Sequence, residues 1–185
     1  QLHNVFCLNL FCSLIISVGV LCQAVCNYFF SIPSIWFENI IYIGTCFLPL
    51  TVFFTSLIFT NTKITFKKSY LLLLVIPILS LVVLWTNDLH HLFYIQYSSS
   101  FTDTIYGPYF YVHSVYTYLL LIIGIGRLLI FSIRNAGFFS KQSLLISIGL
   151  ACPVIVNVLG SFLKLIPMTV FVTPISFSVS IICFA

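Results

Sequence analysis

The residues best suited to chemistry lie together in one short stretch of an otherwise apolar chain. Residues 86–94 read Thr-Asn-Asp-Leu-His-His-Leu-Phe-Tyr, and they open a more polar region that extends to about Tyr111. Imidazole and carboxylate groups are ligands for zinc and other divalent metals, and histidine also titrates close to physiological pH. The same side chains can instead cap helix ends and bond loop backbone. For His90, His91 and Asp88, both interpretations remain open.

The composition places this polar stretch in a membrane protein. Of the 185 residues, 61% are hydrophobic and 5% are charged, whereas a soluble domain carries roughly 25% charged residues. Because so few charges cannot cover a water-facing surface, the expected solvent is the lipid bilayer. The seven basic residues are too few and too scattered to bind nucleic acid. The seven cysteines all lie inside apolar runs, and their odd number argues against a disulfide framework.

Six apolar segments approach or exceed the roughly 17–25 residues that a helix needs to cross a bilayer. Continuous apolar runs without alternation exclude a transmembrane β-barrel, and helices satisfy every backbone polar group within lipid. The predicted fold is therefore an all-α, polytopic membrane helical bundle with six spans. The predicted spans are residues 5–27, 39–60, 70–86, 112–133, 143–163 and 169–185.

The charged residues orient this bundle through the positive-inside rule. The loops after the second and fourth predicted spans together hold five basic residues, and the opposite side holds one. Because an even number of spans separates the two basic loops, both lie on one side, which is predicted to be the cytoplasm. The polar stretch then faces outward. The basic loops contain Lys63, Lys67, Lys68, Arg134 and Lys141, and the outer side contains Lys164, Glu38, Asp88 and Asp103.

A few polar and small residues inside the spans indicate how the helices pack. Asn157 is a lone amide at mid-membrane depth, so we expect it to bond across a helix interface. Four glycines, Gly124, Gly126, Gly149 and Gly160, are expected to let helices approach closely.

The outward-facing polar stretch and the start of the fourth span are predicted to form one site. His113 lies one turn or less inside that span, at the depth where the third span ends. Consecutive segments joined by one connection usually pack together, so Asn87, His90 and His91 are expected to converge with His113 on an external pocket. Polar residues at a membrane boundary favour a ligand pocket over a metal site, although metal binding remains open. The predicted ligand-binding residues are Asn87, His90, His91, Tyr106, His113 and Asn157; we predict no cofactor.

Several short motifs also occur in a characteristic order along the chain. They are Trp36, Ile-Tyr-Ile-Gly at 41–44, Phe-Leu-Pro-Leu at 47–50, residues 86–93, Tyr-Gly-Pro at 106–108, Val-His-Ser-Val-Tyr at 112–116, Pro153 with Asn157, and Thr-Pro-Ile-Ser-Phe at 173–177. In this order and spacing they resemble the N-terminal seven-transmembrane sensor region of bacterial histidine kinases, which also caps some diguanylate cyclases. The resemblance covers nearly the whole chain, and Asn-x-x-His-His-Leu-Phe is its most specific part.

The resemblance implies more than the segments themselves reveal. It implies seven spans with an external N-terminus, so one span is expected before Gln1 and a cytoplasmic output domain after Ala185. Residues 1–185 would then be one transmembrane sensor domain of the bacterial plasma membrane, within a full-length homodimer. The resemblance supplies no defined ligand, and no catalytic residue of a kinase or a cyclase can be assigned here.

Two classes of function fit these observations. In the first, an external or membrane ligand biases the helix arrangement of a sensor, which signals to a cytoplasmic output domain, foremost a histidine kinase of a two-component system. In the second, the chain is part of a small-molecule or ion transporter or channel, which would need charges along a path through the membrane. Apart from Arg127 near one end, the spans offer only Asn157 and hydroxyl groups, so the sequence favours the sensor.

Overall fold

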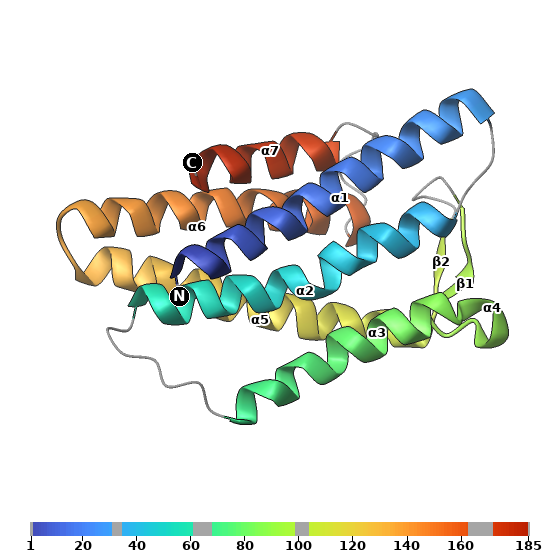
Figure 1. The fold of residues 1–185 in the computed structure, drawn as a ribbon, viewed down its shortest axis with the longest axis horizontal. Helices are drawn as coiled ribbons and strands as arrows, with labels where there is room; N and C mark the ends of the chain where they lie inside the picture. The colour runs from blue at the N-terminus through green and yellow to red at the C-terminus, as the bar shows by residue number, and fades with distance from the viewer. Residues whose placement is uncertain (1, 31–34, 61–67, 99–103, 163–171, 185) are drawn as a thin grey trace.

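The computed structural model describes residues 2–30, 35–60, 68–98, 104–162 and 172–184. Long helices that run along a common axis make up most of the molecule (Figure 1). The elements are α1 (Leu2–Phe30), α2 (Ile35–Thr60), the 3₁₀ helix η1 (Lys68–Leu74), α3 (Val75–Trp85), α4 (Asn87–His90), β1 (Tyr94–Gln96), β2 (Ile105–Tyr106), α5 (Pro108–Arg134), α6 (Phe138–Asn157), the π-helix η2 (Val158–Phe162) and α7 (Val172–Phe184).

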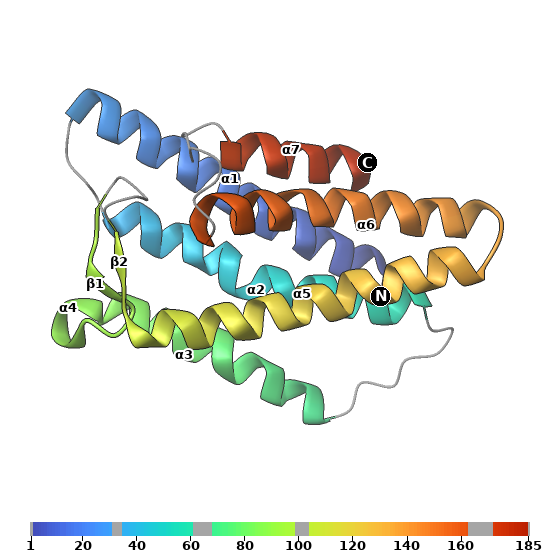
Figure 2. The same ribbon diagram turned by 180° about the vertical axis from the view of Figure 1, so that it is seen from behind.

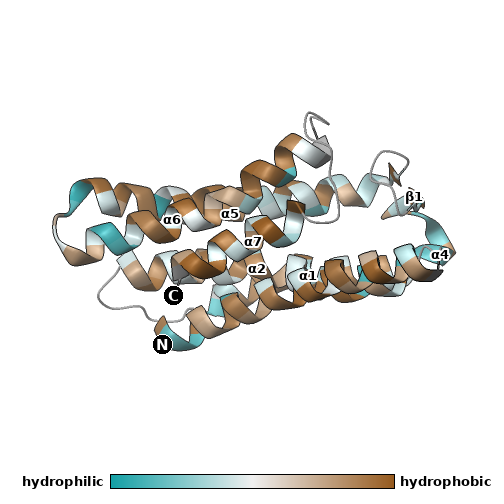
Figure 3. Cartoon of the chain, turned by 90° about the horizontal axis from the view of Figure 1, so that it is seen from above, coloured by the Kyte–Doolittle hydropathy of each residue, from teal (hydrophilic) through white to brown (hydrophobic). Residues whose placement is uncertain are grey.

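The structure confirms the predicted all-α membrane bundle. Within the described residues, α1, α2, α5 and α6 with the start of η2 are long and apolar enough to cross a membrane. Two shorter apolar helices, Tyr70–Trp85 and Val172–Cys183, correspond to the third and sixth predicted spans. The helices consist mostly of hydrophobic residues along their length, and hydrophilic residues are most evident near the ends of the bundle (Figure 3).

The observed structure differs from the predicted spans at the corner of the bundle that holds α4, β1, β2 and the start of α5, which is called the outer corner after its predicted orientation. Helix α5 begins at Pro108, four residues before the predicted span, because proline suits the first turn of a helix. A two-stranded antiparallel sheet pairs Tyr94 with Tyr106 and Gln96 with Ile105, which the sequence did not predict. The two strands could not be predicted because segments of three and two residues are too short to show an alternation of polar and apolar residues.

Five of the helices pack side by side into a closed ring. Following the contacts, α1 packs on α2, α2 on α5, α5 on α6, α6 on α7, and α7 returns to α1. Helix α3 lies outside this ring, against α2 and α5. Figures 1 and 2 show the arrangement from opposite sides, with the long helices running in the same general direction but inclined to each other. A ring of this kind leaves an interior that side chains from all five helices can face.

Glycines set the closest approaches within the ring. A Cβ atom on Gly124 would lie 3.1 Å from Cγ1 of Val52, and a Cβ atom on Gly149 would lie 2.6 Å from Cβ of Cys183. Both glycines therefore permit the tight helix packing that the sequence predicted. The same prediction is wrong for Gly126, because a Cβ atom there would meet nothing within 4 Å.

The basic residues that the structure describes lie toward one end of the bundle. Lys68 begins η1, Arg134 ends α5, and Lys141 lies in the first turn of α6. These helix ends lie opposite the end that carries α4, β1 and β2 (Figure 1). This grouping agrees with the loop pairing inferred from the lysines. Lys63, Lys67, Asp103 and Lys164 lie outside the described residues.

Candidate functional site

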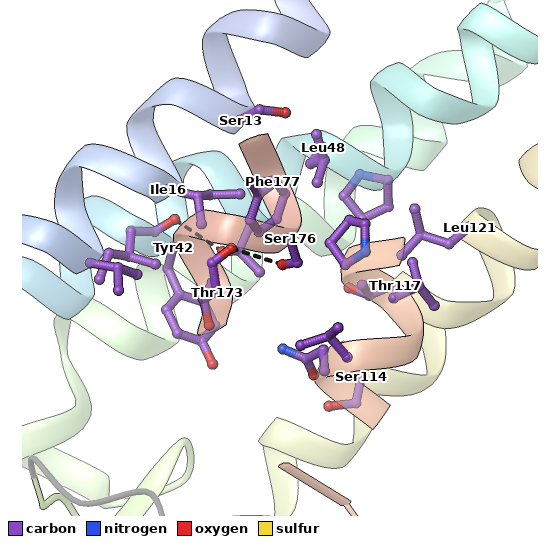
Figure 4. A pocket seen from close by; sticks show the side chains of 18 of the residues that line it. Ser13, Ile16, Tyr42, Leu48, Ser114, Thr117, Leu121, Thr173, Ser176 and Phe177 are labelled. Atoms are coloured by element: carbon purple, nitrogen blue, oxygen red, sulfur yellow. Dashed lines mark hydrogen bonds between the residues drawn. The ribbon is translucent and has the colours of Figure 1, made fainter. Parts of the chain in front are cut away.

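The interior of the helix ring contains a cavity of about 180 Å³. Residues of α1, α2, α5, α6 and α7 line it, together with Tyr94 and Tyr106 from the two strands. Figure 4 shows side chains from several of these helices facing a shared space. Apolar side chains form most of its wall: Ile16, Val20, Ile41, Leu48, Leu121, Leu150, Val154 and Phe177. A mostly apolar cavity with a few converging polar groups is typical of a small-molecule site.

The most polar part of the wall centres on the carboxylate of Glu38, in the first turn of α2. Its Oε1 accepts a hydrogen bond from the Tyr94 hydroxyl at 2.9 Å, and its Oε2 accepts one from Nε2 of Gln23 at 3.3 Å. The hydroxyl of Tyr94 also lies 3.2 Å from that of Tyr42. Gln23 makes a further hydrogen bond to the Tyr97 hydroxyl. The network therefore joins α1, α2 and β1 at one end of the cavity.

The electrostatic setting keeps the strand tyrosines of this network protonated. Burial raises the pKa of Tyr94 well above its ordinary value, and the nearby carboxylate of Glu38 raises it further. The same two causes, in the same order, raise the pKa of Tyr106 to about 12. Both phenols are therefore neutral hydrogen-bond donors near neutral pH.

Asn87 is a buried support for Tyr94, and it does not line the cavity. Its Oδ1 accepts hydrogen bonds from the backbone N–H groups of Phe93 and Tyr94, each at 2.9 Å. Its Nδ2 donates to the Tyr94 carbonyl at 3.0 Å. The side chain of Asn87 thus fixes the backbone that carries the Tyr94 ring toward Glu38.

His90 and His91 lie at the end of α4, away from the cavity lining. Nδ1 of His90 accepts from the backbone N–H of Leu92 at 3.0 Å, and its Nε2 lies 3.0 Å from Oγ1 of Thr86. His91 is exposed and has a left-handed backbone with φ of 52°. His90 therefore acts as a cap at the end of α4, because its side chain accepts a hydrogen bond from the backbone that follows. His91 occupies the left-handed position that ends many helices. The geometry does not bring either histidine to a pocket shared with His113.

Three of the predicted residues, Tyr106, His113 and Asn157, do line the same cavity. His113 is buried, and its Nδ1 lies 3.0 Å from Oγ of Ser80 on α3. Its ring packs near that of Tyr42, with 5.6 Å between the centroids. The Tyr106 ring stacks on Phe110 at a centroid separation of 3.9 Å.

Asn157 bonds across a helix interface, as predicted. The hydroxyl of Tyr118 on α5 donates a hydrogen bond to Oδ1 of Asn157 on α6 at 2.8 Å. Both side chains belong to the cavity wall. Whether any of the six predicted residues binds a ligand stays a prediction.

Four residues of the network around Glu38 were not among those predicted for the site: Gln23, Glu38, Tyr42 and Tyr94. A usable signal is present, because Glu38 is one of three acids in the chain and lies in the first turn of an apolar helix. An ionisable residue in such a helix is a functional candidate by default. Tyr42 follows Glu38 by four residues, which places both on one helix face. Among the described residues, no group of three or more His, Cys, Asp or Glu side chains could hold a metal ion.

Comparison with known protein families gives a match over residues 1–185, to the family described as the N-terminal 7TM region of histidine kinase. The chain belongs to this family. The match confirms the resemblance drawn from the motifs, and it identifies the helix ring as the membrane region of a histidine kinase. Comparisons with curated proteins and with solved structures found no match. The cavity is therefore the feature of this histidine kinase region that bears most directly on its function.

Proposed function

We propose that this chain is the ligand-sensing input domain of a bacterial two-component receptor, and that its ligand binds in the cavity of the helix ring. The domain, residues 1–185, lies in the bacterial plasma membrane with α4 and the two strands outside. The output domain is cytoplasmic, foremost a histidine kinase, and the full-length protein is a homodimer. Family membership and the position of the cavity support this proposal.

The observation that carries the proposal is the participation of α7 in the cavity wall. Thr173, Ser176, Phe177 and Ser180 of α7 line the same space as Glu38 of α2. An occupant therefore contacts α7 and the helices on the opposite side of the ring together. If it fits one arrangement of α7 better than another, its binding shifts the population toward that arrangement. Because α7 forms part of the cavity wall, such a shift is a suitable signal to the proposed output domain.

A transporter or channel is less well supported. Glu38 is the acidic residue among the described residues that line the cavity, and none of that lining is lysine or arginine. Arg127 lies apart from the lining, where its Nη2 donates to Oγ1 of Thr60 at 2.9 Å. A charged path through the ring is therefore lacking in the described part of the chain.

Filling the cavity tests the sensor function without knowledge of the ligand. Thr117 faces the cavity from α5 (Figure 4), so Thr117→Phe is expected to occupy part of the space permanently. We expect the basal autophosphorylation rate of the full-length kinase in membrane vesicles to change by about fivefold or more, the lower range of typical coupling between sites.

The matched control is Val115→Phe on the same helix, where the side chain is 60% exposed and outside the cavity lining. It adds a similar ring but is expected to leave the rate unchanged. Thr117→Val, which removes the hydroxyl group without filling the space, separates volume from polarity. An unchanged rate in Thr117→Phe, at equal membrane abundance, would contradict the proposed function.

The orientation of the domain is tested by labelling from outside the cell. In a background without the native cysteines, Gln96→Cys in β1 is expected to react with a membrane-impermeant maleimide in intact cells. Lys141→Cys in α6 is expected to react only after the membrane is opened. Both native side chains are exposed, so access depends on the side of the membrane. Reaction of Lys141→Cys with protection of Gln96→Cys would invert the topology.

A further inference from the structure

The cavity wall carries one acidic side chain, Glu38, and its described lining contains no lysine or arginine. Glu38 is partly buried at the cavity wall, and both of its oxygens accept hydrogen bonds from neutral groups. Neutral donors do not cancel the charge of an ionised carboxylate, which is costly to hold away from water without a counter-charge. The first turn of α2 gives partial compensation, because a helix N-terminus favours an acidic residue. The helix N-terminus does not explain why this carboxylate lines a cavity.

The surroundings of this carboxylate suit an organic cation. The aromatic rings of Tyr42, Tyr94 and Tyr106 line the same end of the site as Glu38. Aromatic faces attract ammonium groups, and the attraction is stronger where water is excluded. A carboxylate among aromatic rings therefore offers an ammonium group both charge pairing and a favourable apolar surface.

We propose that the cavity binds a small amphipathic amine, whose ammonium group pairs with Glu38 and whose apolar body lies against Leu48, Leu121 and Phe177. This inference rests on the proposed function of the cavity as the ligand site. The volume of about 180 Å³ limits the ligand to a small molecule, because the pockets that hold drug-sized ligands measure roughly 300–1,000 Å³. A bare metal ion fits the site less well, since it would need more carboxylate or imidazole ligands than one glutamate.

A pair of probes that differ only in charge tests the inference. The protein is placed in nanodiscs of zwitterionic phosphatidylcholine, so that the lipid does not attract cations. Binding of 2-phenylethylamine and of the uncharged 2-phenylethanol is measured by isothermal titration calorimetry. We expect the amine to bind at least tenfold more tightly than the alcohol.

Two acidic residues supply matched variants. Glu38→Gln keeps the size of the side chain and its ability to accept hydrogen bonds, and it is expected to weaken amine binding at least tenfold without changing binding of the alcohol. Asp88→Asn removes one charge from the same end of the molecule, at an exposed position outside the cavity lining, and it is expected to change neither. Glu38→Asp, which keeps the charge, should retain a preference for the amine if Glu38→Gln proves unstable.

The outcomes separate this inference from the proposed function. Equal affinity for amine and alcohol, equal loss in Glu38→Gln and Asp88→Asn, or no binding of the amine would each overturn the cationic ligand. None of these results alters the expected effect of Thr117→Phe on kinase activity, which is measured without any probe. Conversely, selective amine binding together with an unchanged kinase rate in Thr117→Phe would keep the amine site and reject the sensor.

Discussion

Asn87→Ala is expected to destabilise the outer corner of the bundle more than any other single truncation there. The alanine removes the acceptor of two hydrogen bonds, which the backbone N–H groups of Phe93 and Tyr94 donate to Oδ1. It also removes the donor of a third, from Nδ2 to the Tyr94 carbonyl. These groups are buried, and each buried polar group left unpaired costs roughly 1–3 kcal/mol. The free energy of unfolding should therefore fall by about 3 kcal/mol or more. Thermal unfolding of the purified protein in detergent measures the loss.

Two variants show whether the loss comes from these bonds. Asn87→Asp keeps Oδ1 as an acceptor for both N–H groups but loses the donated bond, so it should lie between the wild type and Asn87→Ala. Asp88→Ala alters the exposed neighbouring residue and should leave the melting temperature within error. The same melting temperature in Asn87→Ala and the wild type would show that Asn87 does not hold the corner.

Gly149→Leu is expected to displace α7 from α6. Even the first atom of a side chain at this position would lie 2.6 Å from Cβ of Cys183 and 3.4 Å from Cα of Ser180. Ser180 also donates a hydrogen bond to the Gly149 carbonyl, which holds the two helices in register. Overpacking typically costs about 1–3 kcal/mol, and here it moves the helix proposed to carry the signal. We expect a lower melting temperature and an autophosphorylation rate that no longer differs between wild-type and Thr117→Phe backgrounds.

Gly126→Leu on α5 is the matched control for this substitution. It gains the same helix propensity, but its side chain enters open space, since a Cβ atom there meets nothing within 4 Å. The difference between the two glycine variants therefore isolates the packing of α6 on α7. If both variants unfold at the same temperature and keep the same kinase rate, α6 and α7 are not tightly coupled.

The membrane fold was predictable because its signals are long and repeated. Lipid allows only structures that satisfy their own backbone, so continuous apolar runs specify helices even where β-branched residues are common. The prediction of close helix packing is correct at Gly149 and wrong at Gly126. A glycine in a membrane helix does not reveal whether a neighbouring helix lies on its side. The strands of the outer corner were missed because Tyr94 and Tyr106 pair through backbone bonds that leave no pattern in two or three residues.

The candidate site was only partly predictable. Sequence order correctly suggested that the polar stretch approaches the start of α5, where Tyr106 and His113 reach the cavity. The sequence pattern points first to His90 and His91. In the structure, however, His90 accepts a hydrogen bond from the backbone N–H of Leu92, and His91 is the residue that follows α4. Glu38 lies far from this stretch in sequence, and only the packing of α2 against β1 brings it to Tyr94. A site of this kind arises from three-dimensional neighbours that spacing along one chain does not disclose.

The close contacts of α1 have a mechanical consequence. A Cβ atom on Gly44 would lie 2.6 Å from the carbonyl oxygen of Cys12, and one on Gly19 would lie 2.6 Å from Cγ1 of Ile41. The close contact of α1 with α2 therefore extends from Cys12 to Gly19, with Ile16 between them. Within the described residues, the side-chain hydrogen bonds from α1 to other elements all come from Gln23. With Ile16 as the fulcrum, Gln23 lies about 10 Å away on one arm and Leu2 about 21 Å away on the other. A rigid α1 would therefore move its Leu2 end about twice as far as Gln23, in the opposite direction, whenever a ligand at Glu38 displaces that amide.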